Sequence, residues 1–295
     1  MPVGNWDEIR TAYEVARRGT VSGAAEALGV HHATVIRHID ALETRLGTKL
    51  FQRHARGYTP TEAGQDLLQV AAATDDQLTQ LVGRIRGRGE EMTGELIVTT
   101  LSGLAPLLTP SLVKFQSDHP DLIVRFLTDE RLFRLEYGEA HVAIRAGAAP
   151  EQPDNVVQAF CEQRGALYAS EDYVRRHGTP ADESDFDGHR FVCHDDAGSR
   201  APFDRWIRAH VPEHQIVFRA TEQRVLQDAV RAGAGIGFLP LWEAEGMDGL
   251  VQVLAPRADW TAPLWLVTHV DLHRSAKVQT FTRFLKEEAK TWPSM

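Results

Sequence analysis

The sequence predicts an α/β protein that begins with an all-α winged helix-turn-helix and continues through a long coiled-coil linker helix into a two-subdomain α/β region. Three observations predict this organisation. Two short helical patterns meet at a glycine within residues 21–40. A narrow apolar stripe with heptad spacing follows in residues 61–88. From residue 94 onward, strand and helix patterns alternate, which is typical of a parallel sheet with helical crossovers.

The composition is that of a globular protein. Of its 295 residues, 43% are hydrophobic and 25% are charged, which allows a sizeable core. No apolar run is long enough to span a bilayer, and the N-terminal "MPVGNWDEIR" lacks the apolar segment of a secretory signal. Cys161 and Cys193 are far apart and outside any metal-binding spacing, so we expect reduced thiols. These features predict a cytoplasmic protein without a membrane partner.

The net charge of −9 is unevenly distributed along the chain. Residues 1–60 hold eight Lys and Arg against six Asp and Glu, whereas residues 94–295 hold 21 against 29. A nucleic-acid partner would therefore meet the N-terminal region, where positive charge is in slight excess. Because this bias is mild, we expect DNA affinity to depend on more than one copy of the region.

Three helical patterns fill the first 50 residues. The first ends at Gly19, and its apolar face consists of Trp6, Ile9, Tyr13 and Ala16. Ser22 is the expected N-cap of the second, and Gly29 supplies the turn to the third, which begins near His31 or His32. The apolar face of the third consists of Val35, Ile39, Leu42 and Leu46. Two short helices that meet at a glycine-containing turn predict a helix-turn-helix.

A hairpin and a long helix are predicted next. Basic residues flank Gly57 within residues 51–59, which indicates a tight hairpin, or wing. Residues 59–62, Thr-Pro-Thr-Glu, are typical of a capping box with Pro60 at the first helical position. The helix then runs to about Arg86, and its apolar seam consists of Leu67, Ala71, Thr74, Leu78, Leu81 and Ile85. The seam predicts dimerisation; the alternative is a surface helix packed on its own domain.

The remainder of the chain alternates between strands and helices. The predicted strands comprise residues 95–100, 122–128, 141–147, 165–170, 189–194 and 262–269. The predicted helices among and after them include residues 101–120, 131–140, 172–178 and 277–290, and residues 224–245 show a helix, a glycine-rich turn and a strand. Strand–helix–strand order predicts a parallel sheet with right-handed crossovers.

Several motifs, in this order, resemble the LysR-type transcriptional regulators over nearly the whole chain. "SGAAEALGV", "LETRLGTKLFQR" and "TPTEAG" resemble the winged helix-turn-helix of that family. "HVAIRAG", "DAVRAGAGIGFLP" and "PLWLVTH" resemble its periplasmic-binding-protein-like effector domain. The implied domains are residues 1–60 for DNA binding, 61–88 for the linker helix, and 94–295 for effector binding, the last divided into 94–163 with 269–295, and 164–268.

The resemblance implies a transcriptional regulator whose binding to promoter DNA is modulated by a small-molecule effector. It also implies a homodimer through the linker helix, further association into a homotetramer, an imperfect palindrome as the DNA site, and a direct or indirect effect on RNA polymerase. The recognition helix departs from the family pattern: His31, His32 and Ala33 stand where Ser-Gln-(Pro or Ser) is usual, and Ile36 replaces a usual Ser. The operator preferences of relatives therefore do not transfer.

The N-terminal turns of the third helix are expected to meet base edges in the major groove, and the wing is expected to follow the phosphates. The residues expected to contact DNA are His32, Ala33, Thr34, Arg37, His38, Arg53, Arg56 and Tyr58. Arg37 can bind guanine O6 and N7 together, or it can bind a phosphate, and both remain open. A histidine beside a phosphate would strengthen DNA binding as the pH falls; a neutral surface histidine is the alternative.

Open α/β sheets bind ligands beyond the carboxyl ends of their strands, and the resemblance adds a cleft between two subdomains. The residues expected there are Thr100, Ser102, Thr128, Arg145, His194, Ser199 and Thr221. A helix N-terminus near Ser102 and the charge of Arg145 favour a small organic anion. Alternatively, Ser102 only caps a helix and Arg145 bridges surface carboxylates; aromatic or neutral effectors stay open.

Other functional classes have weaker support. No nucleophile elbow, zinc-protease motif or phosphate-binding loop is present, so no catalytic residue is expected. The turn at Gly233, Gly235 and Gly237 lacks the acidic partner of a dinucleotide site, and the histidines lack a metal-ligand spacing. We therefore expect neither a cofactor nor a metal. The alternative is an enzyme or a solute-binding protein built on the C-terminal α/β domain.

Overall fold

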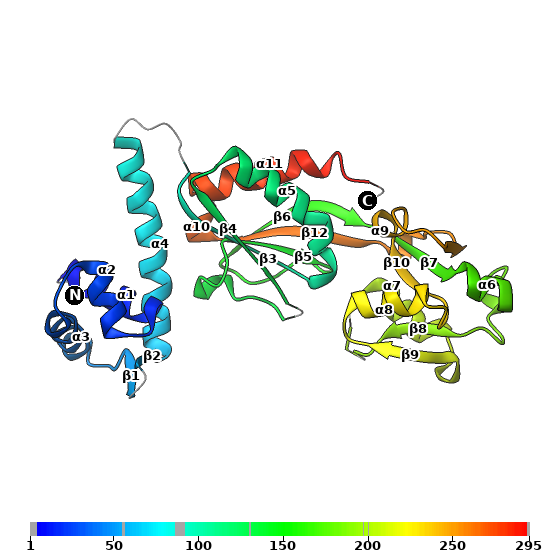
Figure 1. Ribbon diagram of the computed structural model, residues 1–295, viewed down its shortest axis with the longest axis horizontal. Coiled ribbons are helices and arrows are strands. Elements are labelled where there is room, and N and C mark those ends of the chain that lie inside the picture. The colour runs from blue at the N-terminus through cyan, green and yellow to red at the C-terminus, as the bar shows by residue number, and fades with distance from the viewer. Residues whose placement is uncertain are drawn as a thin grey trace.

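The computed structural model describes residues 5–54, 57–85, 92–129, 131–196, 198–199 and 201–293. Figure 1 shows a small N-terminal head, a lobe built on a five-stranded sheet (lobe I) and a lobe built on two smaller sheets (lobe II). The long helix α4 (Glu62–Ile85) begins in the head and contacts lobe I at the short helix η2 (Leu135–Tyr137). Among the helices of the described residues, none is both long and apolar enough to cross a membrane.

The head contains three helices and a two-stranded wing. Its elements are α1 (Trp6–Arg18), α2 (Val21–Leu28), α3 (His32–Leu46), β1 (Phe51–His54) and β2 (Gly57–Pro60). One buried cluster joins them, and its fully buried members are Ala12, Val15, Ala24, Val35 and Ile39. The small side chains of Ala24 and Ala25 allow α2 to lie close to its neighbours, as a helix-turn-helix requires.

Glycine ends each of the three short helices, but the start of α2 differs from the prediction. The expected N-cap, Ser22, is wrong: Thr20 is the cap, and its Oγ1 accepts a hydrogen bond from Gly23 N at 3.1 Å. The reason is that Gly19, at φ 71°, ends α1 and leaves Thr20 extended, so α2 begins two residues earlier than a Ser22 cap would allow. Gly29 has φ 64° and supplies the predicted left-handed turn before α3.

The wing forms as predicted, and it is attached to the end of α1. Tyr58 N donates a hydrogen bond to Gly19 O at 2.8 Å. Gly57 has φ 143°, and a Cβ there would lie 2.2 Å from Gly19 O, so only glycine fits. Pro60 is the last residue of β2 rather than the first of a helix, which corrects the predicted capping box. Thr61 caps α4, because its Oγ1 accepts from Gly64 N at 3.2 Å.

Lobe I contains a mixed five-stranded sheet in the order β4-β3-β5-β12-β6. Strand β3 is parallel to β4 and β5, as predicted, whereas β12 is antiparallel to both β5 and β6. Its elements are β3 (Gly94–Thr100), η1 (Ser102–Leu104), α5 (Ala105–Asp118), β4 (Leu122–Thr128), η2, β5 (Val142–Ala146), β6 (Asn155–Gln163), β12 (Ala262–His269), α10 (Val270–His273) and α11 (Ala276–Ala289). Helices α5 and α11 pack together, and their apolar residues share one buried cluster with the sheet.

The helix predicted at residues 131–140 is wrong, because only the single turn η2 forms there. Leu135 is buried in a second cluster, with Ala140 and strand residues Ala143 and Val267. Gly138, at φ 64°, ends the turn. The apolar residues that suggested a helix therefore belong to an irregular segment packed on the sheet.

Lobe II is a smaller α/β unit. Its two sheets, β10-β7-β11 and β8-β9, are joined by a bridge between Phe191 and Ile236. Its elements are β7 (Gly165–Ser170), α6 (Glu171–His177), η3 (Glu183–Asp185), β8 (Phe191–His194), α7 (Pro202–His210), η4 (Glu213–Gln215), β9 (Ile216–Ala220), α8 (Gln223–Arg231), β10 (Gly237–Pro240), α9 (Leu241–Ala244), β11 (Leu250–Leu254) and η5 (Ala258–Trp260).

The glycine-rich turn after α8 has a packing role in lobe II. A Cβ on Gly235 would lie 2.5 Å from Arg190 O, and a Cβ on Gly237 would lie 2.7 Å from a methyl group of Val230. Glycine is therefore required where α8, β8 and β10 approach each other. Close packing therefore explains these glycines, and a bound dinucleotide is not needed to explain them.

The chain crosses between the lobes twice. It leaves lobe I at Arg164, between β6 and β7, and returns from η5 into β12. Strand β12 pairs with β6 over its whole length and with β5 over residues 264–267, so it belongs to the sheet of lobe I, although the sequence placed residues 262–268 in lobe II. The return crossing therefore lies near Thr261, and both crossings adjoin the space between the lobes.

Candidate functional site

The outer face of α3 is the most exposed helical surface of the head. His32, Ala33 and Arg37 are exposed, and Thr34 is half-buried. Val35 and Ile39 on the opposite face are fully buried in the head core, which fixes the helix in place. His31 is the N-cap residue but makes no side-chain capping bond, as its poor match to the family pattern predicts. The first backbone N–H groups of α3 therefore remain available to an acceptor such as phosphate.

His38 lies on the same helix but has a different role. Its Nδ1 forms a hydrogen bond with Thr11 Oγ1 at 2.9 Å, and Thr11 Oγ1 in turn donates to Asp7 O at 2.6 Å. The imidazole is half-buried and joins α3 to α1. His38 thus makes a contact within the head through Nδ1, and its contact with DNA stays a prediction.

A buried carboxylate fastens α3 to the wing. Glu43 is only 3% exposed, and its Oε1 accepts from Leu50 N at 3.0 Å and from Phe51 N at 3.3 Å. Its Oε2 accepts from Lys49 Nζ at 2.6 Å and from Arg53 Nη2 at 3.0 Å. Burial alone would raise the pKa of Glu43, but these hydrogen bonds and the charge of Arg53 outweigh it and lower the pKa. Glu43 therefore positions the first wing strand.

The wing residues are more engaged than the sequence suggests. The guanidinium of Arg53 also binds Asp40 Oδ1 at 2.6 Å and lies 5.3 Å from the centre of the Tyr58 ring. Tyr58 is half-buried and packs on Phe51, with 5.8 Å between ring centres. Arg53 and Tyr58 are thus part of the structure of the wing, whereas Arg56 lies outside the described residues.

The apolar seam residues of α4 lie in two different environments. Leu67 packs against the core cluster of its own head, as the alternative to a coiled coil predicts. Farther along the helix, Leu78 is 52% exposed and Val70, beside the seam, is 65% exposed. At Val70 and Leu78, α4 therefore presents apolar side chains that its own head does not cover.

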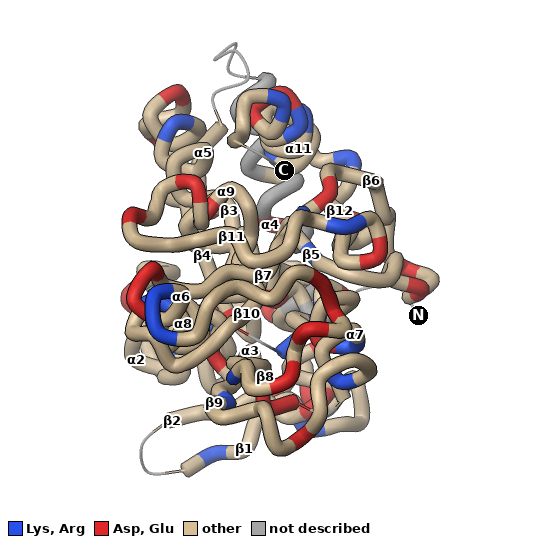
Figure 2. The backbone as a smooth tube through the Cα atoms, turned by 90° about the vertical axis from the view of Figure 1, so that its right-hand side faces the viewer, with Lys and Arg blue, Asp and Glu red and all other residues tan. Residues whose placement is uncertain are grey.

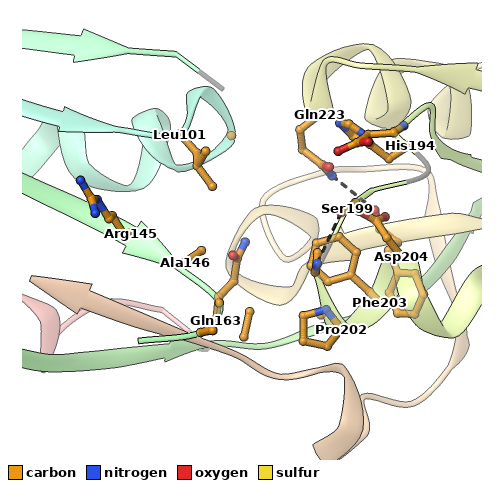
Figure 3. Close-up of a pocket in the computed structure, with 18 of the residues that line it drawn as sticks. Leu101, Arg145, Ala146, Gln163, His194, Ser199, Pro202, Phe203, Asp204 and Gln223 are labelled. Atoms are coloured by element: carbon orange, nitrogen blue, oxygen red, sulfur yellow. Dashed lines mark hydrogen bonds between the residues drawn. The ribbon is translucent and has the colours of Figure 1, made fainter. Parts of the chain in front are cut away.

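A cavity of about 890 Å³ lies between the two lobes. Figure 3 shows Leu101, Arg145 and Ala146 on the lobe I side and Ser199, Phe203 and Asp204 on the lobe II side, with Gln163 between them. Trp260 and Ala262, beside the return crossing, also line it. The lobes approach each other at Gly103, where a Cβ would lie 3.2 Å from the Gln223 side chain. Movement of one lobe against the other would therefore change the cavity.

The lobe II wall is held by a hydrogen-bonded loop. His194 Nε2 bonds Thr221 O at 2.8 Å, and His194 Nδ1 accepts from Asp196 N at 3.1 Å. A carbonyl only accepts and a backbone N–H only donates, so both ring nitrogens are satisfied by a neutral imidazole. His194 and Thr221 line the cavity, but these bonds give them a bracing role.

Asp204 lies beside this loop, in the first turn of α7. Its Oδ2 accepts from Ser199 Oγ at 2.5 Å. Burial raises the pKa of Asp204, and the hydrogen bond from Ser199 opposes this rise. The positive charge of Arg208 also opposes the rise, and its guanidinium donates to the backbone oxygens of Asp196 and Ser199. Figure 2, which looks onto lobe II, shows acidic positions around α7 and β8.

Arg145 is the most buried charged side chain of the cavity lining. It is 9% exposed, and its Nη2 donates to Phe133 O at 2.9 Å. Its Nη1 is buried and has no hydrogen-bond partner among the described residues. Burial lowers the pKa of Arg145, and the charge of Glu136 opposes this effect. In Figure 3 the side chain extends along lobe I, away from the wall that carries Asp204.

Three of the residues expected at the cleft do not line it. Thr100 is buried, and its Oγ1 donates to Ile144 O at 3.1 Å within the sheet. Ser102 begins η1, but its neighbours Leu101 and Gly103 line the cavity instead. Thr128 is exposed at the end of β4, the edge strand of the sheet. The strand-end rule selected the edge of the sheet that borders the cavity, but not which side chains face the cavity.

Two family models together cover nearly the whole chain. Residues 6–65 match the bacterial regulatory helix-turn-helix protein, lysR family, and residues 89–290 match the LysR substrate binding domain. The second match alone spans more than half of the chain. The chain belongs to the LysR family of transcriptional regulators. It is therefore a DNA-binding regulator with an effector-binding domain, and not an enzyme.

Individual relatives agree over most of their length. The regulator is 27% identical to the HTH-type transcriptional regulator CrgA of Neisseria meningitidis serogroup C (strain 8013), over 96% of this chain and 97% of that protein. The crystal structure of ArgP from Mycobacterium tuberculosis shares its fold, with a TM-score of 0.74 and 19% identity over 98% of each chain. Full-length CbnR, in complex with its target DNA, has a TM-score of 0.58 and 19% identity over 96% of this chain and 99% of that chain.

Several residues of the regulator's cavity were not predicted from the sequence. They include Leu101, Gln163, Phe203, Asp204, Gln223, Phe238 and Trp260. One sequence signal was available for Asp204: "APFDRW" places a proline at a helix start and an acidic residue in its first turn. In the part of the chain that the structure describes, no group of His, Cys, Asp and Glu side chains is arranged to hold a metal ion.

Proposed function

We propose that two copies of this regulator pair through α4 and place their α3 helices in successive major grooves of promoter DNA. The exposed N-terminal turns of α3 carry this proposal. They offer Arg37 for a bidentate contact with guanine, or for a phosphate, and His32 and Ala33 for close approach to base edges. Two symmetric heads fit an imperfect palindrome whose half-sites are about one helical turn apart.

Pairing and further association have support in exposed apolar residues. Leu78 on α4 and Trp6 on α1 are 52% and 61% exposed in the single chain. Val113 and Ile123 on lobe I, and Val217 on lobe II, are each about half exposed or more. Association through these lobe surfaces would convert dimers into a homotetramer. Joining two heads also compensates for the weak positive charge of each head. Once one head is bound, the second head meets the DNA at a high effective concentration.

We also propose that the cavity between the lobes binds a small-molecule effector with an anionic group. The positive charge of Arg145 in the cavity lining supports this part, because it attracts an anionic group. An effector that prefers one arrangement of the lobes shifts the protein toward it. The contact between η2 and α4 provides a route to the heads, and a changed head spacing alters DNA bending and access of RNA polymerase.

The test combines footprinting with a mass measurement. Full-length protein is applied to the DNA upstream of its own gene and of neighbouring operons, with and without metabolite pools. Protection of two half-sites by a dimer or tetramer is the expected result. A protein that remains a single subunit at micromolar concentration and protects none of these regions would contradict the proposal.

A further inference from the structure

The recognition helix α3 carries an exposed apolar side chain that the core of the head does not use. Ile36 is 39% exposed and lies outside the buried cluster that joins the three helices. Val35, the residue before it, is fully buried, as is Ile39 three positions later. The face of α3 that packs on the head is therefore complete without Ile36, whose side chain is free to meet a partner outside the head.

Contacts farther along α3 show which way Ile36 faces. Residues three or four positions apart lie on one side of a helix, so Ile36, Asp40 and Glu43 form a row. Asp40 binds Arg53 of the wing at 2.6 Å, and Glu43 accepts a hydrogen bond from Phe51 N at the start of the first wing strand. Ile36 therefore lies on the wing side of α3, one turn nearer the N-terminus than the contacts that fasten the wing.

Ile36 also shares its surface with the residues proposed to meet base edges. Ala33 lies three positions before it and Arg37 directly after it, and both are exposed. Figure 1 shows α3 on the side of the head that faces away from the two lobes. Asp40, the exposed carboxylate of the row, is paired with Arg53, which weakens its repulsion of phosphates. A groove that receives Arg37 therefore meets Ile36 as well.

The major groove offers an isoleucine one kind of favourable partner. Base edges there present hydrogen-bond donors and acceptors, and the apolar group among them is the C5 methyl group of thymine. Beside the polar edge of another base, an isoleucine would displace water without replacing the lost hydrogen bonds, which is unfavourable.

We infer that Ile36 contacts the C5 methyl group of a thymine in each half-site and gives the regulator a preference for thymine at that position. This inference rests on the proposed placement of α3 in the major groove. It assigns to Ile36 a readout of shape and apolarity, beside the hydrogen bonds or charge that Arg37 offers. The two neighbouring side chains thus recognise different chemical groups of the same half-site.

Deoxyuridine in place of thymidine tests the inference, because it removes the methyl group and keeps every hydrogen-bonding group of the base pair. Each thymidine of the two footprinted half-sites is replaced in turn, and the affinity of the full-length protein is measured at one salt concentration. We expect one position in each half-site at which the replacement weakens binding about fourfold, the effect of losing contact with one methyl-sized apolar group. Replacement at both positions should weaken binding about fifteenfold, because the two half-sites are well separated.

Matched variants assign the methyl contact to Ile36. Ile36→Ser should weaken promoter binding and should bind the thymidine and deoxyuridine fragments equally. The head should still fold, because Ile36 is exposed and the two residues have similar helix propensities. Arg37→Ala should bind both fragments more weakly but should keep the preference for thymidine. The control Val270→Ser changes an exposed apolar residue of lobe I and should alter neither affinity.

Two results would overturn the inference. One is binding that is insensitive to every deoxyuridine replacement, and the other is a preference for the methyl group that persists in Ile36→Ser. Footprinting separates these results from failure of the proposed function. A protein that protects both half-sites without a methyl preference still places α3 on promoter DNA through other contacts, whereas a protein that protects no promoter region contradicts the proposed function and this inference together.

Discussion

In the head, the side chains that we propose to read bases come from one helix of 15 residues, α3. The lining of the cavity, in contrast, extends from Leu101 to Ala262 and includes both lobes and both crossings. Short-range signals such as Gly19 and Gly29 place the recognition helix, because they fix where neighbouring helices end. No short-range signal places Arg145 in the same cavity as Asp204. The head is thus a local structure, and the cleft is a product of the whole fold.

Among the substitutions that should affect the head but not the cavity, Glu43→Ala is expected to cause the largest loss of stability. Glu43→Ala removes the acceptor of two backbone N–H groups and two basic side chains, at a cost of about 3 kcal/mol in the local stability of the head. Hydrogen exchange at Leu50 and Phe51 measures this change. Hydrogen exchange in the segments that line the cavity should be unaffected, because the head does not contribute to the cavity.

The matched control is Asp40→Ala, which removes an exposed partner of Arg53 and should cost less than about 1 kcal/mol. Equal losses of stability in Glu43→Ala and Asp40→Ala would show that the burial of Glu43 does not increase its contribution to stability. Faster hydrogen exchange around the cavity in Glu43→Ala would show that the two regions are coupled even without DNA.

An intermediate loss of stability is expected at the N-cap of α2, and it tests where this helix begins. Thr20→Ala removes the hydroxyl that accepts from Gly23 N and should cost about 1 kcal/mol. Ser22→Ala should change stability by less than about 0.5 kcal/mol, because Ser22 is exposed inside the first turn. Urea denaturation, with hydrogen exchange of the α2 amides as the readout, compares the stabilities of the two variants. A larger loss of stability in Ser22→Ala than in Thr20→Ala would show that Ser22, the N-cap predicted from the sequence, caps α2.

The smallest effect is expected in lobe II, as a dependence of stability on pH. Burial lowers the pKa of His189, which bonds Tyr173 OH through Nδ1 at 3.2 Å. Because the pKa is lower in the folded state than in the unfolded state, the stability is complete above the ordinary histidine pKa of about 6.5. It is lost as the pH falls below that value and through the lower pKa of the folded state. The thermal midpoint of lobe II should follow this decline.

The matched variants for this effect are His189→Gln and His214→Gln. Glutamine at position 189 keeps a polar partner for Tyr173 but does not titrate, so the decline should become shallower. His214 is exposed, and its replacement should leave the profile unchanged. The same decline in all three proteins would assign the pH dependence to another group.

The sequence predicted the head more closely than the cleft, for physical reasons. Capping and glycine signals act over four or five residues, so the helices were located and errors such as Ser22 for Thr20 were small. The parallel strands β3, β4 and β5 were predicted because strand patterns alternate with helical ones in this region, which favours a parallel sheet. The helix expected at 131–140 failed, because its apolar residues cover a sheet face, and tertiary packing overrides a local preference.

The cleft shows which information was missing. The strand-end rule included Arg145 and Ser199, which line the cavity, but also Thr100, whose hydroxyl turns into the sheet. Whether a side chain at a strand end faces the cavity depends on the twist of the sheet and on the opposite lobe. Asp204 was not predicted, because "APFDRW" indicates the start of α7 but not that this start faces the other lobe.

The binding of promoter DNA by Arg37→Ala tests the central claim most directly. The affinities of the wild type and of the variant are compared on a footprinted promoter fragment and on random DNA of the same length and at the same salt concentration. The account predicts a loss of about 1–3 kcal/mol on the promoter and a much smaller loss on random DNA, because Arg37 reads a base from the exposed face of α3. Unchanged promoter affinity in the variant would contradict the placement of α3 in the groove.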